Sequence, residues 1–454
     1  MLKVNELIES SGGRLIRQGC DTLITGISID SRTIKPREAF IAIKGDNLDG
    51  HEFIREAIKK GASCIVKERN KKIRCNDKRV TFIEVRDTAR ALGEIARFWR
   101  RQFPVPVIAV TGSNGKTTTK EMTAHILSAK LKVLKNEGTK NNHIGVPMTL
   151  LELNGTYDVA VIELGANHFG EISYLCGICE PNMGIITNIG PSHLKYFHNL
   201  SGVLKEKYAM IDNLDSPRIA ILNSDDNILK KKIFSGCARG ITLCFGIKNP
   251  CEFMASGVRG FNNKTGFCVN KKYKFTLNTP GYYNIYNALA AIAAARIFGM
   301  TYRDIRSRLN NFSFPQGRLE VMESKGVRFI DDTYNSNPHS LKQALNTLAN
   351  FKTKGRKIFI MGDMLELGIR EEGFHRQAGR EAIRCCDVFI TVGSLSRLAA
   401  KAAGGPRLKT KAIFTCRNSA QARRVLFNNI SPGKDDLVLI KGSRRMKMEE
   451  IIRR

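Results

Sequence analysis

Short apolar stretches alternate with polar segments through the first hundred residues, at residues 23–29, 39–43, 64–66 and 81–85. Residues 89–99 follow a different pattern, with apolar side chains at the spacing of a helix face. Residues 102–106 then contain two prolines, and neither fits inside a helix or a central strand. The pattern predicts a small α/β domain that ends in a linker.

Beyond this linker the chain changes to short, continuous apolar runs separated by helix-like stretches, at residues 107–110, 159–164, 184–189 and 219–222. Strands that are buried on both faces give such runs, so we predict a parallel α/β sheet. An alanine-rich helical stretch follows at 287–298, and residues 311–315 indicate another boundary. The pattern then repeats at residues 329–330, 357–361, 388–392, 412–414 and 437–440.

Length agrees with this division, because 454 residues exceed one ordinary core and suggest about three domains. We predict an α/β protein with a small α/β N-terminal domain at 1–103, a central parallel-sheet domain at 104–314 and a Rossmann-like C-terminal domain at 315–454.

Charge is the most unusual feature of the composition, since 73 Lys and Arg against 42 Asp and Glu give a formal net charge of +31. A nucleic-acid-binding protein would gather such charge in patches. Here the basic residues are dispersed and aromatic residues do not interleave with them, so we favour a solvated basic surface that attracts acidic substrates such as nucleotides.

The chain carries no signal-peptide pattern and no apolar run of membrane-spanning length, so we expect a cytoplasmic protein. Its twelve cysteines show no disulfide-like spacing and are expected to be reduced there. Cys176 and Cys179 form one C-x-x-C pair, but no second pair or histidine cluster completes a zinc site.

The strongest chemical signal is the run Thr111-Gly112-Ser113-Asn114-Gly115-Lys116-Thr117, which lies between an apolar run and a helical stretch. A helix N-terminus there favours phosphate, and glycines let the backbone wrap the anion. Lys116 would bind the β- and γ-phosphates, and Thr117 would offer its hydroxyl to Mg²⁺. Val110 stands where the strict Walker pattern has glycine, so the loop is a variant of that pattern.

Two further candidates lie at the carboxyl ends of predicted strands, where an open parallel sheet forms its ligand crevice. Glu163 opens the run Glu-Leu-Gly-Ala-Asn, and His193 ends the run Thr-Asn-Ile-Gly-Pro-Ser-His. Both side chains are candidate metal ligands. Each is also an ordinary surface polar group when taken alone.

These motifs, in this order, resemble the Mur ligases, and the resemblance extends across essentially the whole chain. It is carried by residues 29–32, 45–51, 111–117, 139–147, 163–167, 187–193, 222–226 and 284–291. Two C-terminal motifs, residues 331–338 and 365–368, are similar to the branch of the family that adds D-alanyl-D-alanine. The end of the chain, at 441–444 and 448–449, also fits.

The resemblance implies a three-domain, ATP-dependent acid–amino-acid ligase of peptidoglycan synthesis that forms a C–N bond. The N-terminal domain would bind the UDP substrate, and the central domain would be a P-loop-type ATPase domain. Its substrates would be UDP-N-acetylmuramoyl-tripeptide and D-alanyl-D-alanine, and its cofactors ATP and Mg²⁺. It implies substrate contacts from Ser31, Arg32, Asp49, His51, Asn141, Asn142, Tyr334, Asn335 and Asn337. It implies nucleotide contacts from Gly112, Ser113, Asn114, Gly115, Lys116, Thr117, Thr118, Asn287 (adenine), Arg318 (phosphates) and Asp331 (ribose).

The resemblance also implies that Thr117, Glu163, His193 and Lys207 hold magnesium. Lys207 falls where these ligases carry a lysine carbamylated by carbon dioxide, so Lys116, Lys207 and His193 are the implied catalytic residues. The chain departs from the family pattern at Tyr208-Ala209, Tyr283 and Ser336. In the implied reaction the substrate carboxylate is phosphorylated by ATP, and the dipeptide amine then displaces phosphate.

Two alternatives stay open. One is another amide ligase of the same superfamily, which adds a single amino acid or is a folylpolyglutamate synthase, and the other is a nucleic-acid-stimulated ATPase. For the favoured function we expect a monomer with no nucleic-acid partner and no stable insertion into a membrane. The basic surface predicts weak contact with the anionic inner membrane.

Overall fold

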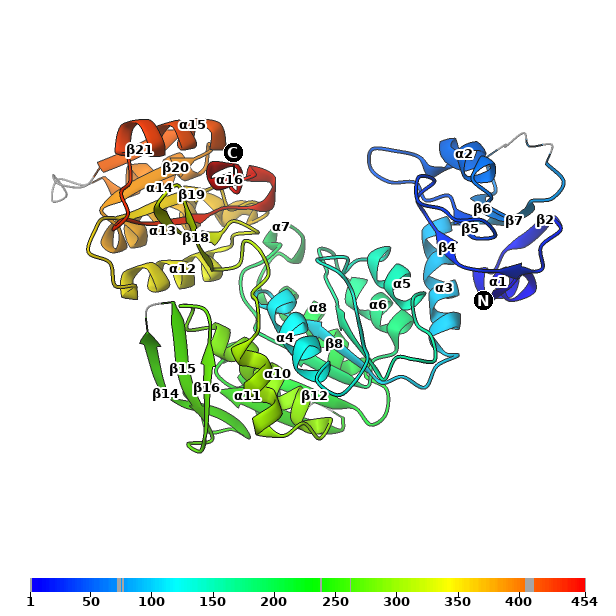
Figure 1. Ribbon diagram of the computed structural model, residues 1–454, viewed down its shortest axis with the longest axis horizontal. Helices are drawn as coiled ribbons and strands as arrows, with labels where there is room; N and C mark the ends of the chain where they lie inside the picture. The colour runs from blue at the N-terminus through cyan, green and yellow to red at the C-terminus, as the bar shows by residue number, and fades with distance from the viewer. Residues whose placement is uncertain are drawn as a thin grey trace.

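The computed structural model describes residues 2–71, 75, 77–236, 239–261, 263–404 and 412–453. Figure 1 shows three lobes, with the N-terminal lobe (blue) and the C-terminal lobe (yellow to red) on either side of a central one (cyan to green). Each lobe has its own sheet. The predicted α/β class is confirmed, while the boundaries at 103/104 and 314/315 stay predictions.

The N-terminal lobe has a five-stranded sheet in the order β2-β7-β6-β5-β4, and β2 alone runs antiparallel to its neighbour. Its strands are β2 Arg14–Arg17, β4 Ile27–Ser28, β5 Ala39–Ile41, β6 Cys64–Glu68 and β7 Thr81–Val85. Its helices are α1 Val4–Ser11, α2 Ile54–Lys59 and α3 Thr88–Arg100. The helix predicted at 89–99 is α3, and the Asp87 carboxylate caps its first turn by accepting from Arg90 N.

The apolar stretch at 23–29 forms two short strands rather than one. Leu23–Ile24 is β3, which pairs antiparallel with β1 (Leu2–Lys3), while β4 joins the five-stranded sheet. The chain passes from one sheet to the other between Ile24 and Ile27. Thr25, which lies in this connection, donates its backbone N–H to Arg37 O.

The central lobe is built on nine strands in the order β16-β15-β14-β13-β12-β11-β8-β10-β9, and the pairs from β9 to β13 are parallel. Its parallel strands are β8 Val107–Thr111, β9 Val133–Lys135, β10 Val159–Glu163, β11 Met183–Ile186, β12 Ile219–Asn223 and β13 Ile241–Gly246. β14 Phe253–Phe261 pairs parallel with β13, and β15 Lys264–Val269 and β16 Tyr273–Leu277 follow it in antiparallel pairing.

Helices cover both faces of the central sheet, so β8, β10 and β12 are buried along their whole lengths, as their continuous apolar runs predict. These helices are α4 Lys116–Leu127, α5 Gly145–Leu150, α6 Glu171–Cys179, α7 Leu194–Phe197, α8 Leu200–Asp212, α9 Asn227–Phe234, α10 Asn284–Ile297 and α11 Tyr302–Asn310. One apolar core includes residues of α4 and α10, and another includes residues of α6 and α8.

The C-terminal lobe has six strands in the order β17-β18-β22-β19-β20-β21, all parallel except β17. They are β17 Glu320–Ser324, β18 Val327–Asp332, β19 Lys357–Gly362, β20 Val388–Val392, β21 Ala412–Cys416 and β22 Leu437–Lys441. Its α-helices are α12 Pro338–Asn350, α13 Glu371–Cys385, α14 Ser396–Ala403, α15 Ser419–Arg424 and α16 Glu450–Arg453. This is the Rossmann-like sheet that the second series of apolar runs predicts.

Among the residues that the structure describes, no helix is both long enough and apolar enough to cross a membrane.

Candidate active site

A cavity of about 1000 Å³ lies between the central and C-terminal lobes. On the central side it is lined by the loop before α4 and by segments that follow β10, β11 and β12, at the carboxyl edge of the parallel sheet. On the other side it is lined by residues 318–319, 332, 334–340 and 342–343 and by Lys441 of β22. The cavity therefore lies where an open α/β sheet binds ligands.

The loop between β8 and α4 is shaped by its two glycines. Gly112 has φ +144°, and a Cβ atom there would lie 2.0 Å from the Thr187 hydroxyl oxygen. Gly115 has φ +83°, and a Cβ atom there would lie 2.3 Å from Asn287 Oδ1. Only glycine fits both positions, so the loop packs closely against its neighbours while its amides lie at the N-terminus of α4.

The same loop is held from the neighbouring strand end. Asn188 Oδ1 accepts from Asn114 N (3.1 Å), and Asn188 Nδ2 donates back to Asn114 O (2.9 Å). The Ser113 hydroxyl donates to Gly190 O (2.9 Å). Ser113, Asn114, Gly115, Lys116, Thr117 and Thr118 all line the cavity. The loop is thus held in a fixed conformation at the N-terminus of α4.

Lys116 is partly buried and lines the cavity, and Lys207 is fully buried close to Lys116 but is not among the lining residues. Burial lowers the pKa of Lys116, with nearby Glu163 opposing the shift. The pKa of Lys207 is lowered to about 7, mainly by burial and in smaller part by the charge of Lys116, while Glu206 opposes the shift. Because the side chain of Lys207 is only 1% exposed, little water reaches its amine. The site therefore holds an excess of positive charge that suits a polyphosphate.

Glu163 ends β10 and has one oxygen in use and one without a partner. Its Oε1 accepts from Asn141 Nδ2 (2.7 Å), which also brings Asn141 to the cavity. Its Oε2 is buried and has no hydrogen-bond partner among the described residues. A buried, unsatisfied carboxylate oxygen beside a phosphate loop suits a hard divalent cation.

Two residues that the sequence analysis did not single out position Glu163. Asn136 is fully buried, accepts from Glu163 N (2.9 Å) and donates to Glu163 O (3.0 Å). Lys120, one turn after Lys116, is also fully buried and donates to Asn136 O (2.5 Å) and Gly138 O (3.1 Å). The helix that carries the phosphate loop is thereby tied to the strand that carries Glu163.

His193 follows β11, lines the cavity and is about one quarter exposed. Its Nδ1 lies 2.7 Å from Oε2 of Glu366, which belongs to the C-terminal lobe. The hydrogen bond from His193 holds the pKa of Glu366 below its usual range. Its ring is therefore fixed by a residue far away in the sequence.

Three other contacts join the phosphate loop to the C-terminal lobe. Arg318 Nη2 donates to the Thr117 hydroxyl (2.8 Å), and its guanidinium also stacks 4.0 Å from the ring centroid of Tyr334. Asn337 Nδ2 donates to Asn114 Oδ1 (2.8 Å). His339 Nδ1 lies 3.4 Å from Asn114 Nδ2, a contact that no sequence signal had indicated.

Asp331, the implied ribose contact, does not line the cavity, whereas its neighbour Asp332 does. Asp331 is fully buried within β18, and its carboxylate accepts from Thr333 N (3.1 Å) and the Thr333 hydroxyl (2.6 Å). Asp332 lines the cavity and pairs with Lys441 (2.6 Å). Neighbouring side chains on a strand point to opposite faces, so only one of this pair reaches the cavity.

Asn287, Asn142 and Asn335 all line the cavity and also have internal partners. Asn287 Oδ1 accepts from the Thr119 hydroxyl (3.3 Å), and Asn142 Oδ1 accepts from Gly145 N (2.9 Å) at the start of α5. The backbone oxygen of Asn335 accepts from Lys441 Nζ (2.9 Å). Their contacts with adenine or substrate stay predictions.

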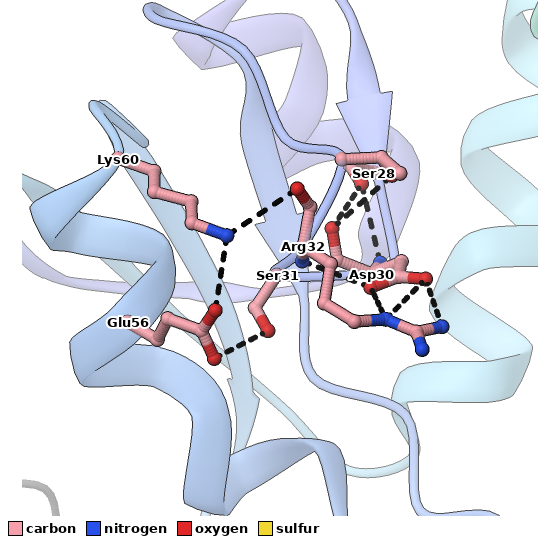
Figure 2. A network of polar contacts seen from close by, with 7 residues as sticks. Ser28, Asp30, Ser31, Arg32, Glu56 and Lys60 are labelled. Carbon is pink, nitrogen blue, oxygen red and sulfur yellow. Dashed lines mark hydrogen bonds and ion pairs between the residues drawn. The ribbon is translucent and has the colours of Figure 1, made fainter.

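The implied UDP contacts lie in the N-terminal lobe and do not line this cavity. Figure 2 shows Ser31 donating to Glu56 (2.9 Å) and the exposed Arg32 pairing with Asp30 (2.7 Å). The Arg32 hydrogen bond lowers the pKa of Asp30 to about 2. Arg32 is thus an exposed cation held in place, a group that suits an anionic ligand.

Asp49 and His51 hold the loop before α2. The Asp49 carboxylate accepts from His51 N (3.0 Å) and lies 2.7 Å from His51 Nδ1. His51 Nε2 accepts from Glu68 N (3.0 Å), so both ring nitrogens are engaged within the lobe. The geometry gives these two side chains a structural role beside the implied ligand role.

Three family descriptions match the chain in order. They are the Mur ligase family, catalytic domain, at residues 23–100, the Mur ligase middle domain at 110–295, and the Mur ligase, glutamate ligase domain, at 317–444. The chain is also 35% identical over 457 residues to the UDP-N-acetylmuramoyl-tripeptide–D-alanyl-D-alanine ligase of Escherichia coli (strain K12), covering 99% of this chain and 97% of that protein. The chain therefore belongs to the Mur ligase family.

Further relatives narrow the match within the family. The ligase of the same name from Bacillus subtilis (strain 168) is 32% identical and covers 95% of this chain and 93% of its own. The crystal structure of MurF from Acinetobacter baumannii matches with a TM-score of 0.89 and 30% identity, over 99% of this chain and 97% of that one. MurF from Thermotoga maritima in complex with ADP gives a TM-score of 0.80 at 27% identity, over 94% and 96%. The chain is thus of the MurF type, as its C-terminal motifs indicate.

Proposed function

We propose that this protein is an ATP-dependent ligase that joins D-alanyl-D-alanine to UDP-N-acetylmuramoyl-tripeptide in peptidoglycan precursor synthesis. The observation that carries the proposal is the convergence of a phosphate loop, Lys116 and the unsatisfied Glu163 carboxylate at one cavity, with the buried Lys207 close to Lys116. The full-length similarity to ligases of this name supports the choice of substrates.

Residues of the central lobe bind the nucleotide and its metal in this proposal. The loop amides and Lys116 bind the phosphates, and Thr117, Glu163, His193 and Lys207 hold Mg²⁺. Bound Mg²⁺ would offset the negative charge that gathers on the transferring phosphoryl group. Arg318 lies within hydrogen-bonding distance of Thr117 and so reaches the same region. Asp332 replaces Asp331 as our candidate for the ribose contact, because it lines the cavity.

The chemistry follows from the poor reactivity of a carboxylate towards amines. A carboxylate oxygen of the tripeptide attacks the γ-phosphorus of ATP, which forms an acyl phosphate and releases ADP. The dipeptide amine then attacks the acyl carbon, the C–O bond to phosphate breaks and the nitrogen loses a proton. Lys116 and Arg318 stabilise the charge, and the enclosing lobes limit hydrolysis of the acyl phosphate by excluding water.

Lys207 takes part as a carbamate in this proposal. A lysine with a pKa of about 7 is half uncharged at neutral pH, and the free amine attacks carbon dioxide to give a carbamate and a proton. The side chain then carries a negative charge and two oxygens. Such a group is a metal ligand and also removes the repulsion between Lys207 and Lys116.

The remaining parts of the proposal concern the molecule as a whole. The domains span 1–103, 104–314 and 315–454, and the first binds the UDP group through Ser31 and Arg32. The protein works in the cytoplasm as a monomer, with weak contact to the anionic inner membrane.

A phosphate-release assay tests the function. Purified protein with ATP and Mg²⁺ is given UDP-N-acetylmuramoyl-tripeptide, D-alanyl-D-alanine, or both, and only the pair should give rapid release and a pentapeptide product. Single amino acids or glutamylated folate replacing the dipeptide test the related ligases. Strong stimulation by DNA or RNA alone would instead favour the nucleic-acid-stimulated ATPase.

A further inference from the structure

Residues 365–368, Leu-Glu-Leu-Gly, are a motif to which the proposed function gives no role. They follow β19 and precede a short 3-10 helix at Gly368–Arg370. Glu366 has φ +64°, a left-handed conformation that is unusual for a residue with a side chain. Such a conformation persists only where surrounding contacts fix it, and it often marks a functional segment.

The loop that carries Glu366 is anchored within the C-terminal lobe. Leu365 N donates to the Ser443 hydroxyl (2.9 Å), and Ser443 N donates to Asp363 O (3.0 Å). Met364 N donates to Nε2 of the buried His375 (3.0 Å). These bonds hold the three residues that precede Glu366, so Glu366 projects from a fixed support.

Glu366 crosses to the central lobe and contacts the segment around His193 at two points. Its Oε2 lies 2.7 Å from His193 Nδ1, and its backbone oxygen accepts from Lys195 N (3.2 Å). Its other carboxylate oxygen faces Arg445 (3.4 Å). His193 itself has φ +50°, so both partners are held in left-handed conformations where they meet.

The hydrogen bond between His193 Nδ1 and the Glu366 carboxylate determines whether the other ring nitrogen, Nε2, can bind a metal. When Nδ1–H donates to Glu366, the proton is on Nδ1 and Nε2 carries a lone pair. Histidines that bind metals commonly donate their second nitrogen to a carboxylate, which fixes the ring and raises its basicity. His193 lines the cavity that Glu163 and the phosphate loop also line.

We propose that Glu366 is a positioning residue that orients His193 for the divalent cation and makes cation binding depend on docking of the C-terminal lobe. This inference rests on the proposed function, in which His193 is a metal ligand. The motif at residues 365–368 thereby acquires a role. It couples docking of the C-terminal lobe over the nucleotide to the orientation of His193 in the metal site.

The test is Mn²⁺ binding in the presence of ADP, followed by electron paramagnetic resonance, for wild-type protein and Glu366 variants. Removal of such a carboxylate typically weakens metal affinity by about 10-fold or more, and we expect Glu366→Ala to show this. Glu366→Gln keeps an oxygen that accepts from Nδ1–H and should retain most of the affinity. Glu372→Ala removes an exposed carboxylate of α13 and is the matched control, with no expected change.

Two further readouts separate positioning from a general structural effect. The kcat of Glu366→Ala should recover at high Mg²⁺ while the Mg²⁺ concentration needed rises, and its thermal unfolding should match that of Glu366→Gln. In a His193→Ala background, Glu366→Ala should bring no further loss of Mn²⁺ affinity.

Unchanged Mn²⁺ affinity in Glu366→Ala would overturn the inference. So would a loss of affinity in Glu366→Gln and Glu372→Ala as large as that in Glu366→Ala. If wild-type protein neither binds Mn²⁺ with ADP nor releases phosphate with both substrates, the proposed function itself fails. If wild type does both and Glu366→Ala behaves like wild type, only the role of Glu366 is wrong.

Discussion

Lys207 and Lys116 place two cationic side chains in a buried region, an arrangement that destabilises a fold unless ligands or chemical modification offset it. Burial lowers the pKa of each, and that of Lys207 falls to about 7. Unprotonated Lys207 relieves part of the repulsion, and the carbamate we propose would relieve all of it. At the residue scale, then, the charge balance of this region already indicates anionic ligands.

Lys207→Ala tests this account of the carbamate. The variant should lose nearly all ligase activity, because a metal ligand is removed, and short-chain carboxylates such as acetate should restore part of it by filling the space with an oxygen ligand. Phosphate release measured over a range of acetate concentrations gives the answer.

Lys205→Ala is the matched control, since Lys205 is exposed on the same helix, and it should keep wild-type activity. Absence of any rescue in a folded Lys207→Ala protein would count against carbamylation while leaving the ligase reaction itself untouched.

Residue types were easier to infer from the sequence than residue orientations. Lys116, Glu163 and His193 all line one cavity. They meet there because the carboxyl ends of parallel strands lie at one edge of the sheet, and the apolar runs predict that sheet. Orientation depends on the alternation of side chains along a strand, which brings Asp332 and not Asp331 to the cavity. Asn136 and Lys120 are buried beneath the site, where they hold the Glu163 backbone in place. Polar residue types give no sign of such burial in the sequence.

At the element scale, strands buried on both faces were the predictable ones. β8, β10 and β20 follow continuous apolar runs that could be read directly. The hairpin strands β15 and β16 were missed because they bury one face only, so polar residues alternate with Phe267, Val269, Phe275 and Leu277. Their antiparallel pairing extends the central sheet away from the site and leaves the cavity to the parallel part.

The turn from β8 into α4 gives a prediction at this scale. Gly115→Ala puts a methyl group 2.3 Å from Asn287 Oδ1 and forces alanine into φ +83°. Such strain costs about 1–3 kcal/mol. The free energy of unfolding, measured by urea denaturation, should fall by about that amount, and ATP binding should weaken as the loop shifts.

Gly373→Ala is the control for the same chemical change. Gly373 lies in α13, and a Cβ atom there meets nothing within 4 Å. Gly373 lies in the first turn of this helix, where alanine has the higher helix propensity, so the free energy of unfolding should not fall and should rise by up to about 1 kcal/mol. If the two variants were equally stable, our account of the phosphate loop would be wrong.

At the scale of the whole molecule, the site is a product of contacts between lobes. Arg318, Asn337 and Glu366 reach the central lobe from positions that are far from Thr117, Asn114 and His193 in the sequence. No periodicity or spacing within one segment indicates such pairs. The motif order identifies the family, but only the three-dimensional arrangement shows which residues of the motifs meet.

The net charge of +31 gives a second prediction at this scale. Dispersed basic residues attract anionic membrane surfaces weakly, at roughly 1 kcal/mol for each residue near the surface. The protein should co-sediment in part with vesicles that contain phosphatidylglycerol and less with purely zwitterionic vesicles, and added salt should release it. No co-sedimentation at physiological salt would remove the membrane contact from the proposal.

The central claim is that a substrate carboxyl group receives the terminal phosphoryl group of ATP before the amine attacks. It is tested most directly by supplying the muramoyl tripeptide with isotopically heavy oxygen in its terminal carboxylate, together with ATP, Mg²⁺ and D-alanyl-D-alanine. Mass spectrometry should then find one heavy oxygen in the released phosphate, because the carboxylate oxygen stays bonded to phosphorus when the amide forms. Product formation with no heavy oxygen in the phosphate would contradict the acyl-phosphate route.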